Sequence, residues 1–232
     1  TRTVPMDARL GGLDDEFFAN AADRGIKLDG SSSVRVDSDA FALPADSPFT
    51  LECTFTPDEA TLTGTRGLVA KTQSSEFALF LNDGVPQFDV HLIAPGAGAG
   101  SYRTAFAKTA MQAGTTYRLA GVWDGKEVRL YVDGVLAGSV SGVGKRTPND
   151  LPLYLGADPG NRGEPTRPIS GVLNDVRLSK VARTISDTQT PLTADDDTVL
   201  FFSLDRRIGP FFPGQGTAGV VGRAVGDVEF AE

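Results

Sequence analysis

Apolar residues recur at every second position in most of the long segments of this chain. In segment 49–56 the apolar side chains are Phe49, Leu51, Cys53 and Phe55. A two-residue period places these four side chains on one face of a β-strand and the polar residues on the other. Because sustained helical periodicity is hard to find, we predict an all-β protein, with Cys53 as a small buried residue of its core.

Turn residues separate the alternating segments. Asp-Gly pairs at 124–125 and 133–134 favour tight hairpins, because glycine accepts the positive φ that such turns require. We therefore predict a three-stranded meander over 117–141. Further strands are expected at 77–81, 88–92, 153–155, 172–178 and 199–204.

Roughly 12 to 14 short strands, without alternating helices, predict an antiparallel two-sheet jelly-roll sandwich. Residues 14–22 and 179–183 are each long enough for one short helical turn. The remaining long stretches are expected to be loops, with 184–197 as a linker over the surface. These loops are 94–101, 142–150 and 158–168.

Charge and hydropathy exclude two classes of partner. The chain carries 30 acidic and 22 basic residues, for a net charge of −8. Nucleic-acid binding needs clustered Lys and Arg to displace phosphate counterions, and no such cluster offsets the negative charge. No run approaches the roughly 18 consecutive apolar residues of a membrane span. We expect a soluble domain with neither a nucleic-acid partner nor membrane insertion.

Reactive side chains are few, since the chain has one histidine, His91, and one cysteine. A single histidine excludes multi-histidine metal centres and leaves His91 as the only histidine for a catalytic triad. One cysteine permits neither an internal disulfide nor a CxxC motif. Because the chain begins at Thr1 without a targeting segment, we expect it to be a piece of a longer protein.

Five segments, in order, resemble laminin-G-like, concanavalin A-like jelly-roll domains of the bacterial type. Residues 26–36, IKLDGSSSVRV, are similar to the opening "FDGSSDYV" strand pair of that family. The chain departs from the family pattern at 116–118, where "W-H/Y-H" is usual, and at 174–175, where an acidic pair is usual. The other matching segments are 49–57, 119–134, 153–183 and 197–205.

The resemblance implies a jelly roll over 25–205. It also implies an N-terminal extension, 1–24, packed on the sandwich, and a C-terminal extension, 206–232, that completes the same domain. By this resemblance the protein is a non-catalytic binding or adhesion module for glycan or protein. Such modules lie beside other domains in larger exported, periplasmic or cell-surface proteins.

Two other functions stay open: a structural spacer without a small ligand, and a glycoside hydrolase. Glucanases of the superfamily need a strand of the form Glu-x-Asp-x-x-Glu, which aims all three carboxylates at the sugar. No such triplet exists here, because Glu52 and Glu127 stand alone on their strands and 14–16 are contiguous acids. We therefore predict no catalytic residues.

The candidate ligand-binding residues are His91, Tyr102 and Arg103. Alternation places His91 on the strand face opposite the apolar residues, a solvent or groove face beside the glycine-rich loop 94–101. Tyr102 and Arg103 follow this loop as an exposed aromatic and hydrogen-bonding pair, or simply as a solvated strand start. Trp123 is expected in the core rather than stacked on a sugar.

The resemblance also implies a structural calcium ion. Ca²⁺ takes six to eight oxygen ligands from carboxylates and backbone carbonyls. Related jelly rolls use an Asp that Asp175 matches, and Asp29 and Asp205 approach it if the terminal strands pair as in the family. Alternatively, Asp29 and Asp175 cap turns or pair with arginine. The acidic run 195–197 is expected to be solvated.

Overall fold

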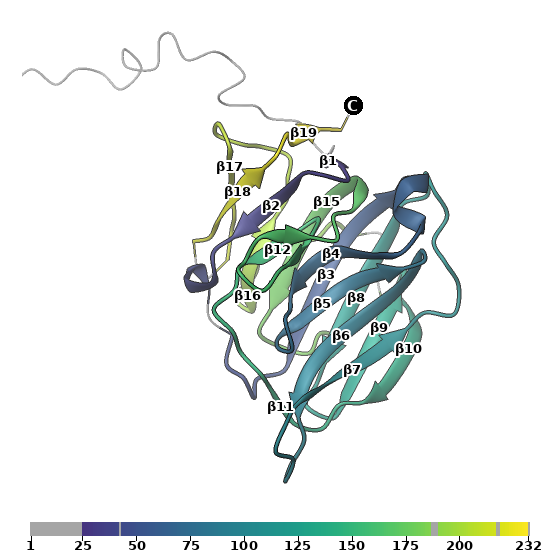
Figure 1. Ribbon diagram of the computed structural model, residues 1–232, viewed down its shortest axis with the longest axis vertical. Helices are drawn as coiled ribbons and strands as arrows, with labels where there is room; N and C mark the ends of the chain where they lie inside the picture. Colours follow the sequence, from purple (N-terminus) through teal and green to yellow (C-terminus); the bar gives the residue numbers. More distant parts are fainter. Residues whose placement is uncertain (1–24, 42, 187–189, 217–218, 232) are drawn as a thin grey trace, which may run out of the picture.

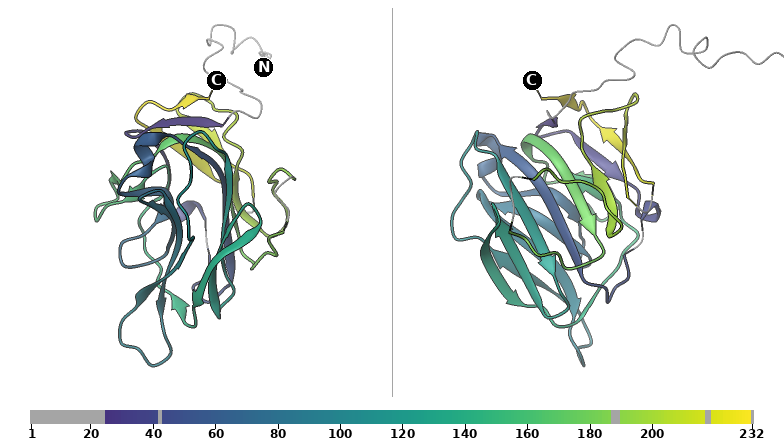
Figure 2. Two further views of the ribbon diagram at one scale, coloured as in Figure 1. Left: turned by 90° about the vertical axis from the view of Figure 1, so that its right-hand side faces the viewer. Right: turned by 180° about the vertical axis from the view of Figure 1, so that it is seen from behind.

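The computed structural model describes residues 25–41, 43–186, 190–216 and 219–231. Two large antiparallel sheets pack face to face as a sandwich (Figure 1; Figure 2, left). The predicted all-β, two-sheet architecture is confirmed. The expected extension 1–24, with its helical turn at 14–22, lies outside the described residues.

Sheet I has eight strands in the order β10-β9-β8-β3-β15-β1-β19, with β16 paired to β15. It faces the viewer in the right-hand panel of Figure 2. The meander expected over 117–141 is confirmed as β8, β9 and β10. The strands are β1 (Ile26–Asp29), β3 (Phe49–Pro57), β8 (Tyr117–Trp123), β9 (Glu127–Val132), β10 (Val135–Ser141), β15 (Ser170–Ser179), β16 (Thr198–Phe202) and β19 (Glu229–Phe230).

Sheet II has nine strands in the order β11-β6-β5-β4-β12-β2-β18-β17, with β7 paired to β6. It lies in front in Figure 1. Its strands are β2 (Ser33–Val36), β4 (Thr65–Lys71), β5 (Phe77–Asn82), β6 (Val85–Ile93), β7 (Ser101–Phe106), β11 (Lys145–Arg146), β12 (Leu153–Leu155), β17 (Phe211–Pro213) and β18 (Val221–Val225).

Two of the three expected loops contain short strands. The 158–168 stretch forms a small hairpin of β13 (Asp158–Pro159) and β14 (Pro165–Thr166), and β11 lies within 142–150. Residues 180–183, expected in a helical turn, are irregular. Because of such short segments, the number of strands in the described residues exceeds the expected 12 to 14. Two 3₁₀ helices, η3 (Ser38–Ala40) and η4 (Glu59–Leu62), complete the described elements.

The core lies between the two sheets and follows the alternation of the sequence. Phe49, Leu51, Cys53 and Phe55 are all fully buried, so the prediction for Cys53 is confirmed. Trp123 is also fully buried, and its indole N–H donates to the Gly142 carbonyl at 2.7 Å. Its predicted place in the core is confirmed, because a buried indole needs such an acceptor.

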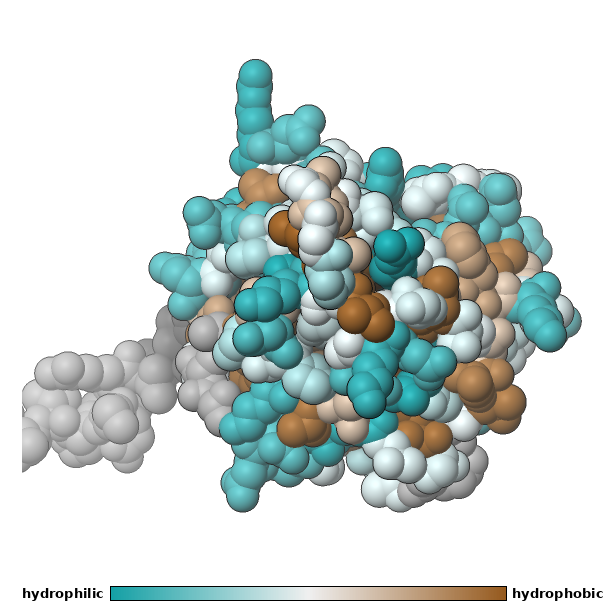
Figure 3. Space-filling view, turned by 90° about the horizontal axis from the view of Figure 1, so that it is seen from below, coloured by the Kyte–Doolittle hydropathy of each residue, from teal (hydrophilic) through white to brown (hydrophobic). Residues whose placement is uncertain are grey.

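A cluster of buried charged side chains lies beside strand β11, next to the core. The Glu76 carboxylate contacts the guanidinium of Arg146 and lies 3.4 Å from the Lys71 ammonium. The Arg146 guanidinium also lies over the rings of Phe49 and Phe77. On the surface, the face seen from below in Figure 3 carries apolar groups as separate patches among polar ones.

The β13–β14 hairpin lies on the outer face of sheet II, against β4. The backbone of Ala157 comes so close to Gly67 that a Cβ there would meet it at 2.5 Å. The buried Asp158 carboxylate accepts hydrogen bonds from Thr72 and, at 3.2 Å, from Arg167. The hairpin therefore divides the outer face of sheet II into two parts.

The last strands of the chain join both sheets. Strands β17 and β18 extend sheet II beyond β2, while β19 pairs with β1 in sheet I. The Ala231 N–H donates to the Gly25 carbonyl at 3.1 Å, which brings the two ends of the described chain together. None of the described helices could cross a membrane, since they have only three and four residues.

Candidate functional site

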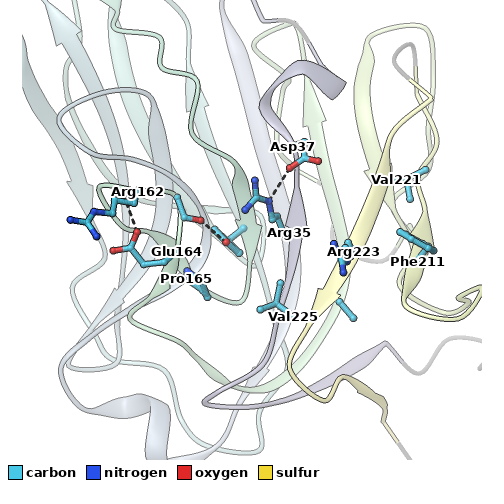
Figure 4. A pocket seen from close by; sticks show the side chains of 12 residues that line it. Arg35, Asp37, Arg162, Glu164, Pro165, Phe211, Val221, Arg223 and Val225 are labelled. Carbon is cyan, nitrogen blue, oxygen red and sulfur yellow. Dashed lines mark hydrogen bonds and ion pairs between the residues drawn. The ribbon is translucent and has the colours of Figure 1, made fainter.

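A groove of about 940 Å³ lies on the outer face of sheet II. Its size falls within the roughly 300–1,000 Å³ of small-ligand sites. One side is the β13–β14 hairpin with Arg162 and Glu164, and the other carries Phe211 and Val221 (Figure 4). Strands β12, β2 and β18 form the floor between them.

Four side chains form one row across the floor. Tyr154 on β12 pairs with Arg35 on β2, Arg35 pairs with Arg223 on β18, and Arg223 pairs with Phe211 on β17. Directly paired residues of antiparallel strands point to the same face of a sheet. The row therefore sets two guanidinium groups between two aromatic rings.

The two arginines differ in their partners. The Arg35 Nε donates to the Asp37 carboxylate at 2.8 Å, and both side chains are well exposed. This hydrogen bond, opposed by some burial, raises the pKa of Arg35. The exposed guanidinium of Arg223 has no hydrogen bond or ion pair with any described residue.

Tyr154 holds the hairpin in place as a wall of the groove. Its buried hydroxyl donates to the Gly163 carbonyl at 2.7 Å, and burial raises its pKa. The Glu164 carboxylate turns back to accept from the Arg162 backbone N–H at 2.9 Å. The first bond ties the hairpin to the floor and the second lies within the hairpin, so the shape of the wall does not depend on a ligand.

Exposed apolar side chains complete the far wall. Phe211 is 46% exposed and Val221 is 51% exposed. The next residue, Phe212, faces the core and is buried, as strand alternation requires. The groove therefore offers hydrogen-bond donors on its floor and an aromatic face at its side, a combination that suits a sugar ring.

His91 lies on the strand face that alternation predicted, but it does not reach solvent. It is only 7% exposed, because the Tyr102 ring packs edge-on against it and Gly100 covers it. Its Nδ1 lies 2.9 Å from the Thr147 hydroxyl, and burial lowers its pKa. The outer strand face was predicted, but the side chain is largely buried on that face rather than open to solvent.

Tyr102 and Arg103 do not form a pair on one surface. Tyr102 lies opposite His91 on the outer face, is 37% exposed, and donates from its hydroxyl to the Ser75 carbonyl. Arg103 lies opposite Val90, whose side chain is in the core, so it points to the other face. Binding of a ligand by His91, Tyr102 or Arg103 stays a prediction.

The three candidate calcium ligands do not converge on one point. Asp175 and Asp205 line one groove on the outer face of sheet I. Asp29 pairs with Ser170, and Ser170 lies five residues along β15 from Asp175, or about 16 Å at the rise of a strand. The three carboxylates therefore do not fit a single ion. A structural calcium ion in this protein stays a prediction, which the melting temperature with and without a chelator tests.

Asp29 instead caps a turn, the alternative that the sequence left open. Its Oδ1 accepts from the backbone N–H groups of Ser31 and Ser32, both at 2.8 Å. These bonds and those from the serine hydroxyls lower the pKa of Asp29 to about 2. The carboxylate is therefore held in place as a cap of this turn.

Sequence reasoning missed the groove residues Arg35, Arg223 and Phe211. One signal was available, since Arg35 interrupts the buried pair Val34 and Val36 on an otherwise apolar strand. An exposed arginine at such a position is ordinary, however. Only the pairing of β2 with β18, far apart in the chain, turns it into part of a site.

Comparison with known families gives one match over most of the chain. A family profile described as the concanavalin A-like lectin/glucanases superfamily matches residues 28–188. No curated protein sequence is significantly similar to the chain.

Solved structures share the fold at low identity. A candidate carbohydrate-binding protein from Bacteroides ovatus has a TM-score of 0.69 and 17% identity over 90% of this chain. The chain spans only 60% of that protein. Domain 4 of AbnA, an extracellular arabinanase from Geobacillus stearothermophilus solved with arabinotriose, scores 0.52 at 18% identity, covering 72% of this chain and 82% of that one. Mouse laminin α1 domains LG4-5 have a TM-score of 0.50 and 18% identity, over 73% of this chain and 44% of that one.

Proposed function

The chain belongs to the concanavalin A-like lectin/glucanases superfamily, and on this premise we propose that it is a non-catalytic glycan-binding module. The ligand lies in the groove on the outer face of sheet II. The observation that carries the proposal is the row of Tyr154, Arg35, Arg223 and Phe211 along that groove. It combines guanidinium donors with an exposed aromatic ring.

Relatives of the same fold support a sugar as the ligand. The arabinanase domain was solved with arabinotriose, and the Bacteroides ovatus protein is a candidate carbohydrate binder. Because the chain spans only part of the latter, we place this module within a larger exported or cell-surface protein. Its neighbours would then be further domains of that polypeptide.

The carboxylates of the groove support binding rather than hydrolysis. Asp37 and Glu164 are both exposed, Asp37 pairs with Arg35, and Glu164 accepts from its own hairpin. The general acid of a glycosidase, by contrast, is kept protonated by an apolar surrounding. Neither groove carboxylate has such a surrounding.

An array of neutral and acidic oligosaccharides tests the proposal. We expect the native protein to bind some members, and Phe211→Ala to weaken that binding by about tenfold, since it removes the exposed ring. The double variant Tyr102→Ala with Arg103→Ala should bind as the native protein does.

The other outcomes identify the alternatives. If the double variant loses binding and Phe211→Ala does not, the ligand binds at the rim near His91 and not in the groove. Absence of binding to every member would favour a spacer domain. Release of reducing sugar from any bound member would show a hydrolase.

A further inference from the structure

The groove on sheet II carries a charge pattern that narrows its ligand. We propose that it binds a sugar bearing an anionic group, a carboxylate or a sulfate, held between the guanidinium groups of Arg35 and Arg223. This inference rests on the proposed glycan-binding function and goes further, because it names the class of glycan.

Two like charges lie in direct register on the floor of the groove. Arg35 and Arg223 pair across β2 and β18, and both side chains point outward. Like charges directly opposite on neighbouring strands destabilise a sheet. Such a pair is unfavourable until an anion lies between the two groups, and it therefore indicates an anion site rather than a structural contact.

One carboxylate, that of Asp37, already neutralises part of the positive charge of this pair. Asp37 occupies the Nε of Arg35 and leaves the terminal nitrogens of that guanidinium available. Arg223 has no acidic partner among the described residues, although the protein as a whole carries a net charge of −8. Its guanidinium therefore carries a positive charge that no acidic side chain offsets, directly opposite a second arginine.

The planar shape of the two guanidinium groups also favours a carboxylate or a sulfate. Planar guanidinium groups bind carboxylate and sulfate through two parallel hydrogen bonds, which lysine does not provide. Phe211 pairs with Arg223 on the side away from Arg35, so a ring attached to the anion reaches its exposed face. The hairpin wall at Glu164 leaves room on the opposite side for neighbouring sugars of an oligosaccharide.

The test uses an array of uronate, sialylated, sulfated and neutral oligosaccharides, probed with three proteins. These are the native chain, Arg223→Gln, and the control Lys126→Gln, which removes one exposed positive charge from the β8–β9 turn. We expect bound members to be anionic, and Arg223→Gln to weaken binding by about tenfold to a hundredfold. Lys126→Gln should bind as the native protein does. Binding should also fall as salt rises from about 20 to 300 mM.

The other possible results would overturn different parts of the proposal. Preference for neutral members overturns the anionic ligand but keeps the glycan-binding function, whereas no binding at all overturns both. Equal losses in Arg223→Gln and Lys126→Gln would show diffuse charge attraction instead of a site. The bound members themselves separate carboxylate from sulfate. Arg223→Lys, which keeps the charge without the planar fork, should lose part of the affinity while the melting temperature shows that it folds.

Discussion

Arg35 and Arg223 lie directly opposite each other on strands β2 and β18, on the outer face of sheet II. Only Arg35 has a carboxylate partner, Asp37. Two groups that repel each other are thus held in register at the floor of a groove. The arrangement costs stability and provides a place for an anion.

Arg223→Glu should make the protein more stable than the native form. It replaces a repulsive cross-strand pair by an attractive one, with an expected gain of about 0.5 kcal/mol in the free energy of unfolding. Urea denaturation at low salt measures the difference. Greater stability of the native protein would show that Arg223 has a structural partner. The same variant should lose binding to anionic sugars, because its carboxylate occupies their place.

Tyr154→Phe should loosen the hairpin wall. It removes the hydroxyl that donates to the Gly163 carbonyl and leaves this carbonyl without its partner. We expect a loss of about 1 kcal/mol in unfolding free energy and faster amide exchange over 160–166. Amides of the distant meander, such as that of Leu130, should exchange as before. Unchanged protection over 160–166 would mean that the hairpin is held mainly by its contacts with β4.

Glu76→Gln should be among the most damaging single changes in the chain. Glu76 is the carboxylate between the buried cations Lys71 and Arg146, and its loss leaves two buried positive charges uncompensated. The expected cost is about 3 kcal/mol. Glu127→Gln, on an exposed side chain of β9, serves as the matched control and should change stability by less than about 0.5 kcal/mol. Similar denaturation midpoints for the two variants would contradict the role of the cluster.

Asp29→Ala should destabilise the protein in a pH-dependent way. Hydrogen bonds hold the pKa of Asp29 at about 2, below its usual 3.8, so its ionised form favours the folded state. That contribution is complete above about pH 4 and disappears as the pH falls through about 2. For this exposed group we expect about 1 kcal/mol at pH 7. Urea unfolding should show a clearly smaller difference between the two proteins at pH 2 than at pH 7. A difference that is the same at both pH values would assign the effect to something other than the carboxylate.

The strands could be predicted from sequence because their causes are local. Alternation in 49–56 and the Asp-Gly turns at 124 and 133 each act within a few residues. The β13–β14 hairpin was not predictable in this way, since prolines at 159 and 165 argue against strand pairing.

The candidate site could not be predicted for a related reason. Arg35 and Arg223 come from the two ends of the described chain, and only the closure of sheet II by β18 brings them together. His91 was assigned to the correct strand face, but its exposure depends on Tyr102 in the next strand and on Gly100 in the loop before it, both of which pack against it. Burial of this kind is a property of tertiary packing.

The most direct measurement is a map of backbone amide shifts by NMR as the protein is titrated with the best-bound oligosaccharide. The groove predicts that the largest shifts fall at Arg35, at 162–165 and at 221–225. Shifts confined to His91 and 101–103, or no shifts at any amide, would contradict a glycan site in the groove of sheet II.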